Sequence, residues 1–382
     1  MTDRQVNVRH FAALAATVRH GSLSRAARAV NLSQPALTQA IAGLEASLGV
    51  TLFERGSSGM TPTEPALLLA PRADAAIAHI GSSRVTGTQV RAFLAVARGG
   101  SYAAAAETTG LSPASLHRAV ADLSVALGQR LLERRGRSLL LTPAGVRRAR
   151  GFGLAMAELR AGLSEVAVWQ GKAGGRIVIG AMPLSRARWL PETIARFTAA
   201  FPNVDIIVLE GSYGELAGPL RDGEIDLLLG ALRDDPPVDL CQEAIFLDNP
   251  SLIMRSGHPL LSSPDIAGEL LSYPWLLPGR ATPLRRYWEA MLARLGLPVP
   301  HIRIECGSVL MIRQLLLAGD GLTLLSPDQV AVELEAGILA ALPTPVPVER
   351  TIGITTRAGW RPTGDQTQFL ELLRIAGKTD KE

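Results

Sequence analysis

The side chains with the clearest capacity for chemistry are short polar and basic groups that follow a serine in two separate stretches of the chain. At the start of a helix, such groups can hydrogen-bond to base edges in the major groove of DNA, while the preceding serine caps the helix. Both stretches therefore predict base-reading helices, although His117 could equally serve in a helix cap. The candidate base-contacting residues are Ser33, Gln34, Pro35, Thr38 and Gln39 in the first stretch and Ser112, Ser115, His117 and Arg118 in the second.

Arginine is concentrated around the second stretch. Between Arg91 and Arg150 the chain has ten arginines and three acidic residues, although the net charge of the whole chain is only +4. A local basic excess is the electrostatic footprint of a protein that binds a polyanion, and its alternative is a solvated face without a partner. The candidate DNA-contacting arginines outside the two helix starts are Arg55, Arg134, Arg135 and Arg137.

The two stretches belong to an internal repeat. Residues 21–37 recur 79 residues later as residues 100–116, with a Gly-Ser pair, an alanine-rich run and a Leu-Ser pair at matching positions. The match continues along the next helix, and after a two-residue insertion Thr61-Pro62 corresponds to Thr142-Pro143. One unit has therefore been duplicated.

Each copy predicts three helices followed by a strand and a wing. A first apolar helix passes through Phe11 or Phe93 and ends at a Gly-Ser cap. A short alanine-rich helix covers 24–30 or 103–109, and Asn31 or Gly110 makes the turn. The third helix has one apolar face at a spacing of three to four residues, and a strand at 51–53 or 130–132 leads into the wing. That face comprises Leu37, Ile41, Leu44 and Leu48 in one copy and Leu116, Val120, Leu123 and Leu127 in the other.

The rest of the chain predicts a long helix, a hinge and an α/β region. Residues 143–169 have helical apolar periodicity, and the glycine-rich run 171–175 interrupts it. From Arg176 onward strands and helices alternate, which predicts an α/β fold with a mostly parallel sheet and a ligand at the carboxyl ends of its strands. The strands are expected at 177–180, 204–209 and 223–230, and the helices at 190–201 and 213–222.

The first copy resembles the DNA-binding unit of the LysR-type transcriptional regulators in Gly21-Ser22-Leu23, in the run from Leu32 to Thr38 and in Leu52-Phe53-Glu54-Arg55. The second copy keeps this framework and the family's Leu141-Thr142-Pro143-Ala144-Gly145, but Pro113-Ala114 stands where the first has Gln34-Pro35. The family normally has one such unit, so the resemblance leaves open which copy reads DNA. The first copy has the better base-reading helix, and the second has the more basic wing.

Residues 176–375 resemble the family's effector domain, which is similar to type 2 periplasmic binding proteins, in Gly223-Glu224-Ile225-Asp226, His258-Pro259-Leu260 and Gly319-Asp320-Gly321. The resemblance implies two all-α winged helix-turn-helix domains followed by an α/β two-lobed domain with an effector in the cleft between its lobes. In the family the long helix pairs with a partner subunit, so homodimers or homotetramers are expected, with packing on the chain itself as the alternative. The implied domains are 1–81 and 86–142 (the two winged units), 143–170 (the linker helix), 171–175 (the hinge) and 176–382 (the effector domain, with lobe I at about 176–247 and 351–382 and lobe II at about 248–349).

Pocket positions implied by the resemblance lie in loops after strands and at helix starts. Hydroxyls and backbone amides at such places, together with one arginine, suit a carboxylate or phosphate, although a serine at a helix start is more often a cap. A weak likeness to the subfamily named for regulation of the galactose-binding protein favours an aromatic or sugar-derived acid. The candidate effector-binding residues are Pro183, Leu184, Ser185, Ser212, Tyr213, Gly230, Arg280, Thr282 and Ser308.

Several function classes have no support in the sequence. The chain has no apolar run long enough to span a membrane, no signal peptide, and only two cysteines, so a cytoplasmic protein without a membrane partner is expected. It has no nucleophile elbow, phosphate-binding loop or metal-ligand cluster, so we expect no enzyme, cofactor or metal. The expected partners are double-stranded promoter DNA, a small-molecule effector and further copies of the chain, with RNA polymerase as a further candidate. The remaining alternatives are an architectural DNA-binding protein with an empty sensor and a solute-binding protein.

Overall fold

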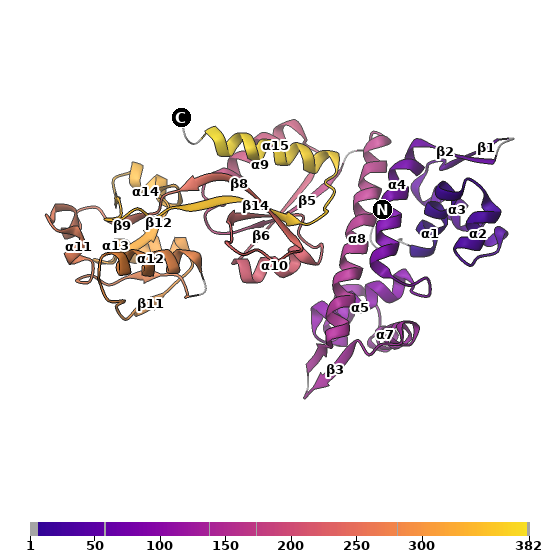
Figure 1. Ribbon diagram of the computed structural model, residues 1–382, viewed down its shortest axis with the longest axis horizontal. Coiled ribbons are helices and arrows are strands. Elements are labelled where there is room, and N and C mark those ends of the chain that lie inside the picture. The colour runs from indigo at the N-terminus through magenta and orange to yellow at the C-terminus, as the bar shows by residue number, and fades with distance from the viewer. Residues whose placement is uncertain (1–6, 57–58, 137, 173, 281, 380–382) are drawn as a thin grey trace.

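The computed structural model describes residues 7–56, 59–136, 138–172, 174–280 and 282–379. It has a helical part, which ends with a long vertical helix in Figure 1, and an α/β part on the other side of that helix. No helix among these residues is both long and apolar enough to cross a membrane.

The helical part contains the same series of elements twice. The first series is α1 (Val8–His20), α2 (Leu23–Ala29), α3 (Gln34–Leu48), β1 (Phe53–Gly56), β2 (Gly59–Pro62) and α4 (Glu64–Ile80). The second is α5 (Gly87–Gly99), α6 (Tyr102–Thr109), α7 (Pro113–Leu127), β3 (Leu132–Arg135), β4 (Ser138–Leu141) and α8 (Pro143–Trp169). Each series therefore includes an antiparallel hairpin, so the expectation that both domains are all-α is wrong. The first strand of each hairpin, β1 or β3, begins two residues later than predicted.

The offset between the two series stays at 79 residues up to the start of the long helices. Thr63 donates its amide to the carbonyl of Leu52 at 3.0 Å, and Thr142 makes the equivalent bond to Leu131 at 3.0 Å. The hydroxyl of Thr63 donates to the backbone carbonyl of Thr51, and the hydroxyl of Thr142 donates to that of Arg130, both at 2.7 Å. Thr63 is thus the counterpart of Thr142. The prediction that Thr61 corresponds to Thr142 after a two-residue insertion is wrong.

The turns and caps follow from local chemistry. Asn31 is the one described non-glycine residue with a positive φ, 55°, and Gly110 has a φ of 70° at the matching turn. Ser101 caps α6 by accepting from the Ala104 amide at 3.1 Å. Ser22 makes no such bond to α2, so the predicted cap is present only in the second series.

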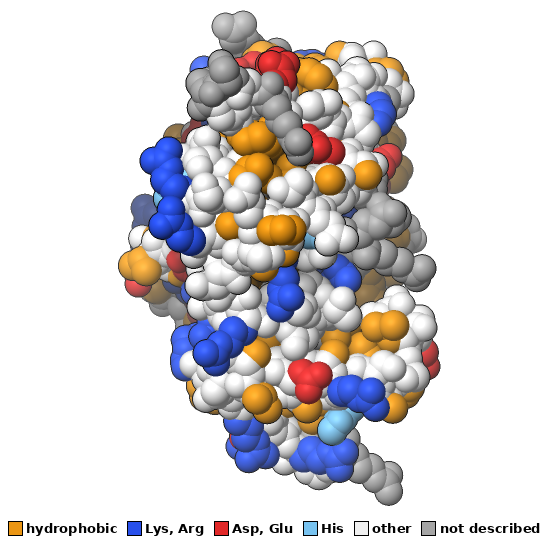
Figure 2. All heavy atoms as spheres, turned by 90° about the vertical axis from the view of Figure 1, so that its right-hand side faces the viewer, with side chains coloured by type: hydrophobic (Ala, Val, Ile, Leu, Met, Phe, Trp, Pro, Cys, Tyr) orange, Lys and Arg blue, Asp and Glu red, His pale blue; other side chains and the backbone are white. Residues whose placement is uncertain are grey.

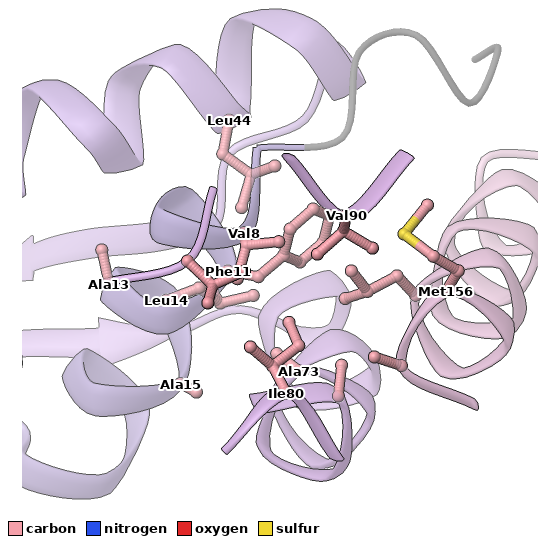
Figure 3. Close-up of a cluster of buried hydrophobic side chains, with 14 of the residues drawn as sticks. Val8, Phe11, Ala13, Leu14, Ala15, Leu44, Ala73, Ile80, Val90 and Met156 are labelled. Carbon is pink, nitrogen blue, oxygen red and sulfur yellow. The ribbon is translucent and has the colours of Figure 1, made fainter. Parts of the chain in front are cut away.

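The two series share one apolar core. Figure 3 shows side chains from α1, α3, α4, α5 and α8 converging, among them Phe11, Leu44, Ile80, Val90 and Met156. The α4 helix, which the sequence did not predict, packs along α8. The linker helix α8 therefore packs along α4 of its own chain.

The α/β part begins with a five-stranded sheet of order β6-β5-β7-β14-β8. The pairs of β5 with β6 and β7 are parallel and the pairs of β14 with β7 and β8 are antiparallel, so the sheet is mixed rather than mostly parallel. One face packs on α9 and α15 and the other on α10 (Figure 1), which gives lobe I a core on each side of its sheet. Lobe I comprises β5 (Arg176–Ala181), α9 (Trp189–Ala200), β6 (Asp205–Glu210), α10 (Tyr213–Arg221), β7 (Leu227–Ala231), β8 (Leu240–Asp248), β14 (Arg350–Arg357) and α15 (Gly364–Thr379).

Lobe II lies between β8 and β14 in the chain and has its own core around Trp275 and Trp288. Its main sheet is antiparallel, of order β12-β9-β13, and a short parallel pair joins β10 to β11. Its elements are β9 (Ser251–Arg255), η2 (Pro259–Ser262), α11 (Ile266–Glu269), β10 (Leu276–Leu277), α12 (Pro283–Arg294), β11 (Ile304–Glu305), α13 (Val309–Leu317), β12 (Thr323–Leu325), η3 (Pro327–Val330), α14 (Ala331–Glu335) and β13 (Leu339–Leu342).

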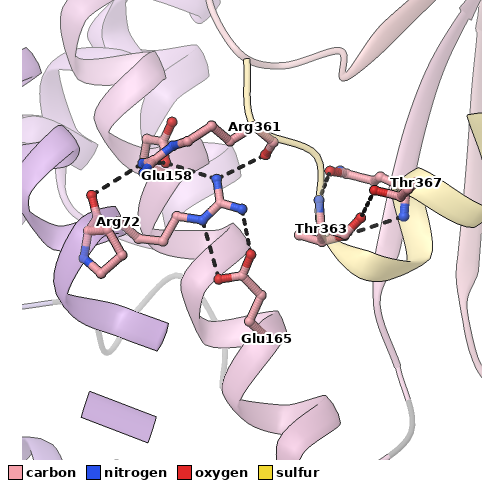
Figure 4. A network of polar contacts seen from close by, with 8 residues as sticks. Arg72, Glu158, Glu165, Arg361, Thr363 and Thr367 are labelled. Atoms are coloured by element: carbon pink, nitrogen blue, oxygen red, sulfur yellow. Dashed lines mark hydrogen bonds and ion pairs between the residues drawn. The ribbon is translucent and has the colours of Figure 1, made fainter. Parts of the chain in front are cut away.

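A buried arginine joins α4, α8 and lobe I. Arg72 pairs with Glu158 at 3.1 Å and with Glu165 at 2.5 Å, and donates to the carbonyl of Arg361 at 2.9 Å (Figure 4). Burial alone would lower the pKa of this guanidinium, but its bonds to the two carboxylates raise the pKa above the ordinary value. A buried cation with two partners is costly to leave unpaired, so this cluster fixes how the helices and lobe I meet.

Candidate nucleic-acid interface and effector pocket

The start of α3 has an exposed polar surface. The Ser33 hydroxyl accepts from the Ala36 amide at 3.3 Å, and the Thr38 hydroxyl donates to the Gln34 carbonyl at 3.0 Å. Gln34, Pro35 and Gln39 are exposed, while Leu37 one turn along is fully buried. The helix is thus anchored by its apolar face and leaves two glutamine amides available to base edges.

The start of α7 has the same frame with different side chains. Ser112 accepts from the Ser115 amide at 3.1 Å, and the two hydroxyls lie 2.9 Å apart. His117 and Arg118 are exposed, and the His117 ring lies 5.3 Å from that of Tyr102. Ser112 therefore caps α7 as Ser33 caps α3, and His117 and Arg118 remain available to DNA.

The hairpin of the second series, formed by β3 and β4, is basic. Its residues Arg134 and Arg135 are exposed on β3. Figure 2 looks onto the helical part and shows basic side chains over this face, with several near its lower end and few acidic ones. The predicted contacts Arg137 and the side chain of Arg55 lie outside the described residues.

The predicted effector hydroxyls are used within the protein. Ser185 is fully buried and donates to the carbonyls of Met182 at 2.8 Å and Leu229 at 3.3 Å. Ser212, Thr282 and Ser308 are N-caps of α10, α12 and α13. Leu184 lies in the lobe I core, Pro183 is half-buried, and Arg280 is exposed.

Tyr213 is the predicted effector residue with the most informative surroundings. Its hydroxyl is buried without a hydrogen-bond partner among the described residues, and the guanidinium of Arg233 lies 4.3 Å from the centre of its ring. Gly230, near the end of the β7 strand, has a φ of 148°, and a Cβ on it would lie 2.4 Å from the side chain of Met182, so this strand position requires glycine.

Arg233 is a partly buried cation that the sequence did not predict: its guanidinium lies over the ring of Tyr213, and its Nε has no hydrogen-bond partner among the described residues. Arg233 follows β7 in lobe I, and Arg286 lies on α12 in lobe II. Burial lowers the pKa of the Arg233 guanidinium, and the positive charge of Arg286 lowers that pKa further. The side chain of Gln242 bonds to both the amide and the carbonyl of Arg233, at 2.8 Å each, so the position is fixed. A partly buried cation whose charge is disfavoured by burial and by a second cation favours an anion beside it.

A cavity lies elsewhere, between α8 and lobe I. It has a volume of about 720 Å³, and Leu154, Asp226 and Trp360 are among its lining residues. None of the predicted effector residues lines it. We assign it to the junction between the helical part and lobe I, because residues of α4, α8 and lobe I line it together. Among the described residues, no group of three or more His, Cys, Asp or Glu side chains is placed to hold a metal ion.

Comparisons with protein families match nearly the whole chain. Residues 170–377 match the LysR substrate binding domain. Residues 8–67 and, separately, 88–146 match the bacterial regulatory helix-turn-helix protein of the lysR family. The two helix-turn-helix matches coincide with the two series of elements described above.

Similar proteins agree with these matches. The HTH-type transcriptional regulator GalR of Pseudomonas putida is 34% identical over 354 residues, which cover 89% of each chain. PcaQ of Agrobacterium fabrum is 29% identical over 296 residues, which cover 77% of this chain and 95% of that one. In fold, the chain resembles full-length OxyR of Pseudomonas aeruginosa (24% identity, TM-score 0.57, covering 76% of this chain and 94% of that chain). It also resembles LysG of Corynebacterium glutamicum with bound effector Arg (18% identity, TM-score 0.55, 76% and 98%). The chain belongs to the LysR family of bacterial transcriptional regulators, with a helix-turn-helix DNA-binding domain and an effector-binding domain.

Proposed function

We propose that both helix-turn-helix series are winged DNA-binding units, which we call head one (α1–β2) and head two (α5–β4), and that an acid bound between the lobes controls them. Head one reads bases through Gln34 and Gln39. Head two adds His117 and Arg118 and grips phosphates through its hairpin. The partner is promoter DNA in the cytoplasm, and the domain boundaries expected from the sequence are part of this proposal.

The observation that carries the DNA-binding proposal is the exposed start of α7. If the second copy had only a structural role, it would need the buried face of this helix to pack in the core. It would not need exposed cationic residues beside a basic hairpin. Arg118, Arg134 and Arg135 are all exposed on the same unit. Exposed cations on a helix start and its wing are what phosphate and base contacts require.

Fluorescence anisotropy on the DNA upstream of the gene tests this role. We expect Gln39→Ala and Arg118→Ala each to weaken specific binding by roughly 10- to 100-fold. Because the heads share one core, point variants are suitable, whereas deletion of one head would expose apolar surface. Unchanged affinity of Arg118→Ala and of Arg134→Ala together would show that head two does not bind DNA.

The effector is proposed to be a carboxylic acid with an aromatic or sugar-derived body. Its carboxylate would lie between Arg233 and Arg286, and its body near the ring of Tyr213. The buried hydroxyl of Tyr213, which lacks a described partner, supplies a hydrogen bond. The effector acts by favouring one arrangement of the lobes, and therefore of the heads, over another.

A thermal-shift panel of aromatic and sugar acids tests the effector site. An acid that raises the melting temperature should lose this effect in Arg233→Met and in Arg286→Met, because either change removes a charge–charge contact. Arg280→Met tests the arginine that the sequence favoured, and Arg303→Met, at another exposed position of lobe II, is the matched control. Loss of the shift only in Arg280→Met would place the acid elsewhere, and a panel without any shift would favour an architectural protein with an unused sensor.

A further inference from the structure

The long helices α4 and α8 run antiparallel. At one end the indole of Trp169, the last residue of α8, donates to Glu64, the first residue of α4, at 2.9 Å. At the other end Arg148, near the start of α8, donates to the carbonyl of Ile80 at 3.3 Å. Arg72 and Glu158 meet between these two contacts. The pair therefore extends along the whole of α4.

Equivalent positions of the two helices are buried in the shared core. At the constant offset of 79 residues, Ala73, Ala76 and Ile80 of α4 match Phe152, Ala155 and Leu159 of α8, and all six are buried. Two copies of one helix that pack on each other in opposite directions, with equivalent positions buried, are related by an approximate two-fold axis.

Reciprocal contacts support this symmetry. In a two-fold pair, a contact of Arg72 with Glu158 requires a contact between the counterparts of these residues, which are Gly151 and His79. A Cβ on Gly151 would lie 2.7 Å from the carbonyl oxygen of His79, so these two positions do touch. A simple tandem arrangement of two units would not give exchanged contacts of this kind.

Each head packs on its own long helix. α1 packs on α4, and α5 packs on α8, where the rings of Phe93 and Phe152 lie 5.9 Å apart. The heads consequently lie toward opposite ends of the helix pair (Figure 1). The 17 residues of α4 span about 25 Å at 1.5 Å per residue, which is of the order of the ~34 Å turn of B-DNA.

We propose that one chain is an internal pseudo-dimer, in which α4 and α8 join two unlike heads into a complete reader of one DNA site. The partner is a duplex with two dissimilar half-sites about one helical turn apart, rather than a palindrome. One half meets the glutamines of α3, and the other meets His117 and Arg118 of α7. The DNA partner rests on the proposed function, but the helix pair does not.

Chemical crosslinking tests the helix pair alone. In a Cys241→Ser, Cys306→Ser background, Glu64→Cys and Trp169→Cys place two exposed thiols at the contact between the ends of α4 and α8. A short bismaleimide should link them within one chain, which migrates as a monomer at every protein concentration. The single-cysteine variants are the controls for random linkage. Dimers in which position 64 of one chain is linked to position 169 of another, at a level above these controls, would overturn the proposal.

Complementation tests whether the two heads of one chain act together on DNA. Gln34→Ala, Gln39→Ala chains are co-expressed with His117→Ala, Arg118→Ala chains, and the mixture is titrated onto the upstream DNA. We expect the mixture to bind no more tightly than the better of the two variants, because neither chain has two intact heads. Recovery of about a quarter of wild-type binding capacity would mean that heads pair between chains and would overturn the pseudo-dimer. A third result is that the His117→Ala, Arg118→Ala variant binds DNA like wild type although the intrachain crosslink forms. That result would show that head two does not bind DNA, while α4 and α8 still pair within one chain.

Discussion

The two heads share a backbone frame but differ where each can meet DNA. Buried positions match closely across the offset of 79 residues, as Leu37 and Leu44 of head one do with Leu116 and Leu123 of head two. Several exposed positions differ, as Gln39 does from its counterpart Arg118. Burial constrains the frame, since a changed volume costs free energy, whereas exposed residues can diverge. The comparison indicates that duplication kept one fold while the exposed side chains of the two third helices diverged.

The largest effect is expected from the shared core. Leu37→Ala and Leu116→Ala each remove a fully buried side chain and should lower the free energy of unfolding by about 2–5 kcal/mol. Because one apolar cluster spans both heads, each substitution should shift the same urea-induced transition, followed by circular dichroism. Two transitions, each sensitive to only one substitution, would show that the heads fold independently.

A smaller effect, on specificity, should separate the heads. Gln39→Ala should cost roughly 1–3 kcal/mol of binding free energy on the specific site and little on unrelated DNA, because an amide reads bases. The corresponding Arg118→Ala should weaken binding to both DNAs if Arg118 contacts phosphate. Competition anisotropy with specific and random duplexes measures the two costs. Equal losses on both duplexes for Gln39→Ala would remove head one from base reading.

The hairpin of head two should set part of the salt dependence. Arg134→Ala with Arg135→Ala removes two exposed cations, so the slope of log affinity against log salt should become shallower by about 1.8, at roughly 0.9 per phosphate contact. Titrations at several salt concentrations give this slope. Arg303→Ala, at an exposed position in lobe II, is the control. An unchanged slope would mean that this hairpin does not touch the backbone.

The smallest expected effect is a loss of folding stability at low pH, caused by histidines of head one and of α4. Burial lowers the pKa of His10, which packs against Gly43 of α3, and of His79 on α4. Below about pH 6.5 the unfolded chain therefore binds protons that the folded chain does not, so stability falls as the pH falls from about 7 through the lowered pKa values. His10→Gln, which introduces the residue of the matching position Gln89, should flatten this decline by roughly half a kcal/mol or less, after allowance for partial exposure. A decline in urea-unfolding free energy that is equally steep in the variant would assign the acid sensitivity to other groups.

The local elements of the heads could be predicted from sequence because their signals are local. The turn at Asn31, the caps at Ser33 and Ser112, and the apolar face of each third helix all depend on residues a few positions apart. The α4 helix was missed because its apolar face is completed only by α8, and because Pro65 and Pro71 suggest interruption. The mixed sheet was missed for a related reason, since β14 enters it from near the end of the chain.

The effector site shows the same limit. Its serines and threonine were identified, but the structure uses their hydroxyls within the protein, as caps, in bonds to carbonyls or, for Ser212, in a bond to the Glu215 carboxylate. The influence of Arg286 on Arg233 joins residues of two lobes, and no spacing in the sequence encodes it. A basic residue two positions after the end of the β7 strand was the one available signal for Arg233.

Hydroxyl-radical footprinting of the full chain on the upstream DNA, at saturating protein, tests most directly whether one chain presents two unlike heads. Two protected segments should appear about 10–11 base pairs apart, centre to centre. The variant His117→Ala, Arg118→Ala should lose one segment, and the variant Gln34→Ala, Gln39→Ala should lose the other. If the head-two variant keeps the wild-type pattern while the head-one variant loses every protected segment, a single head reads the DNA and the account is contradicted.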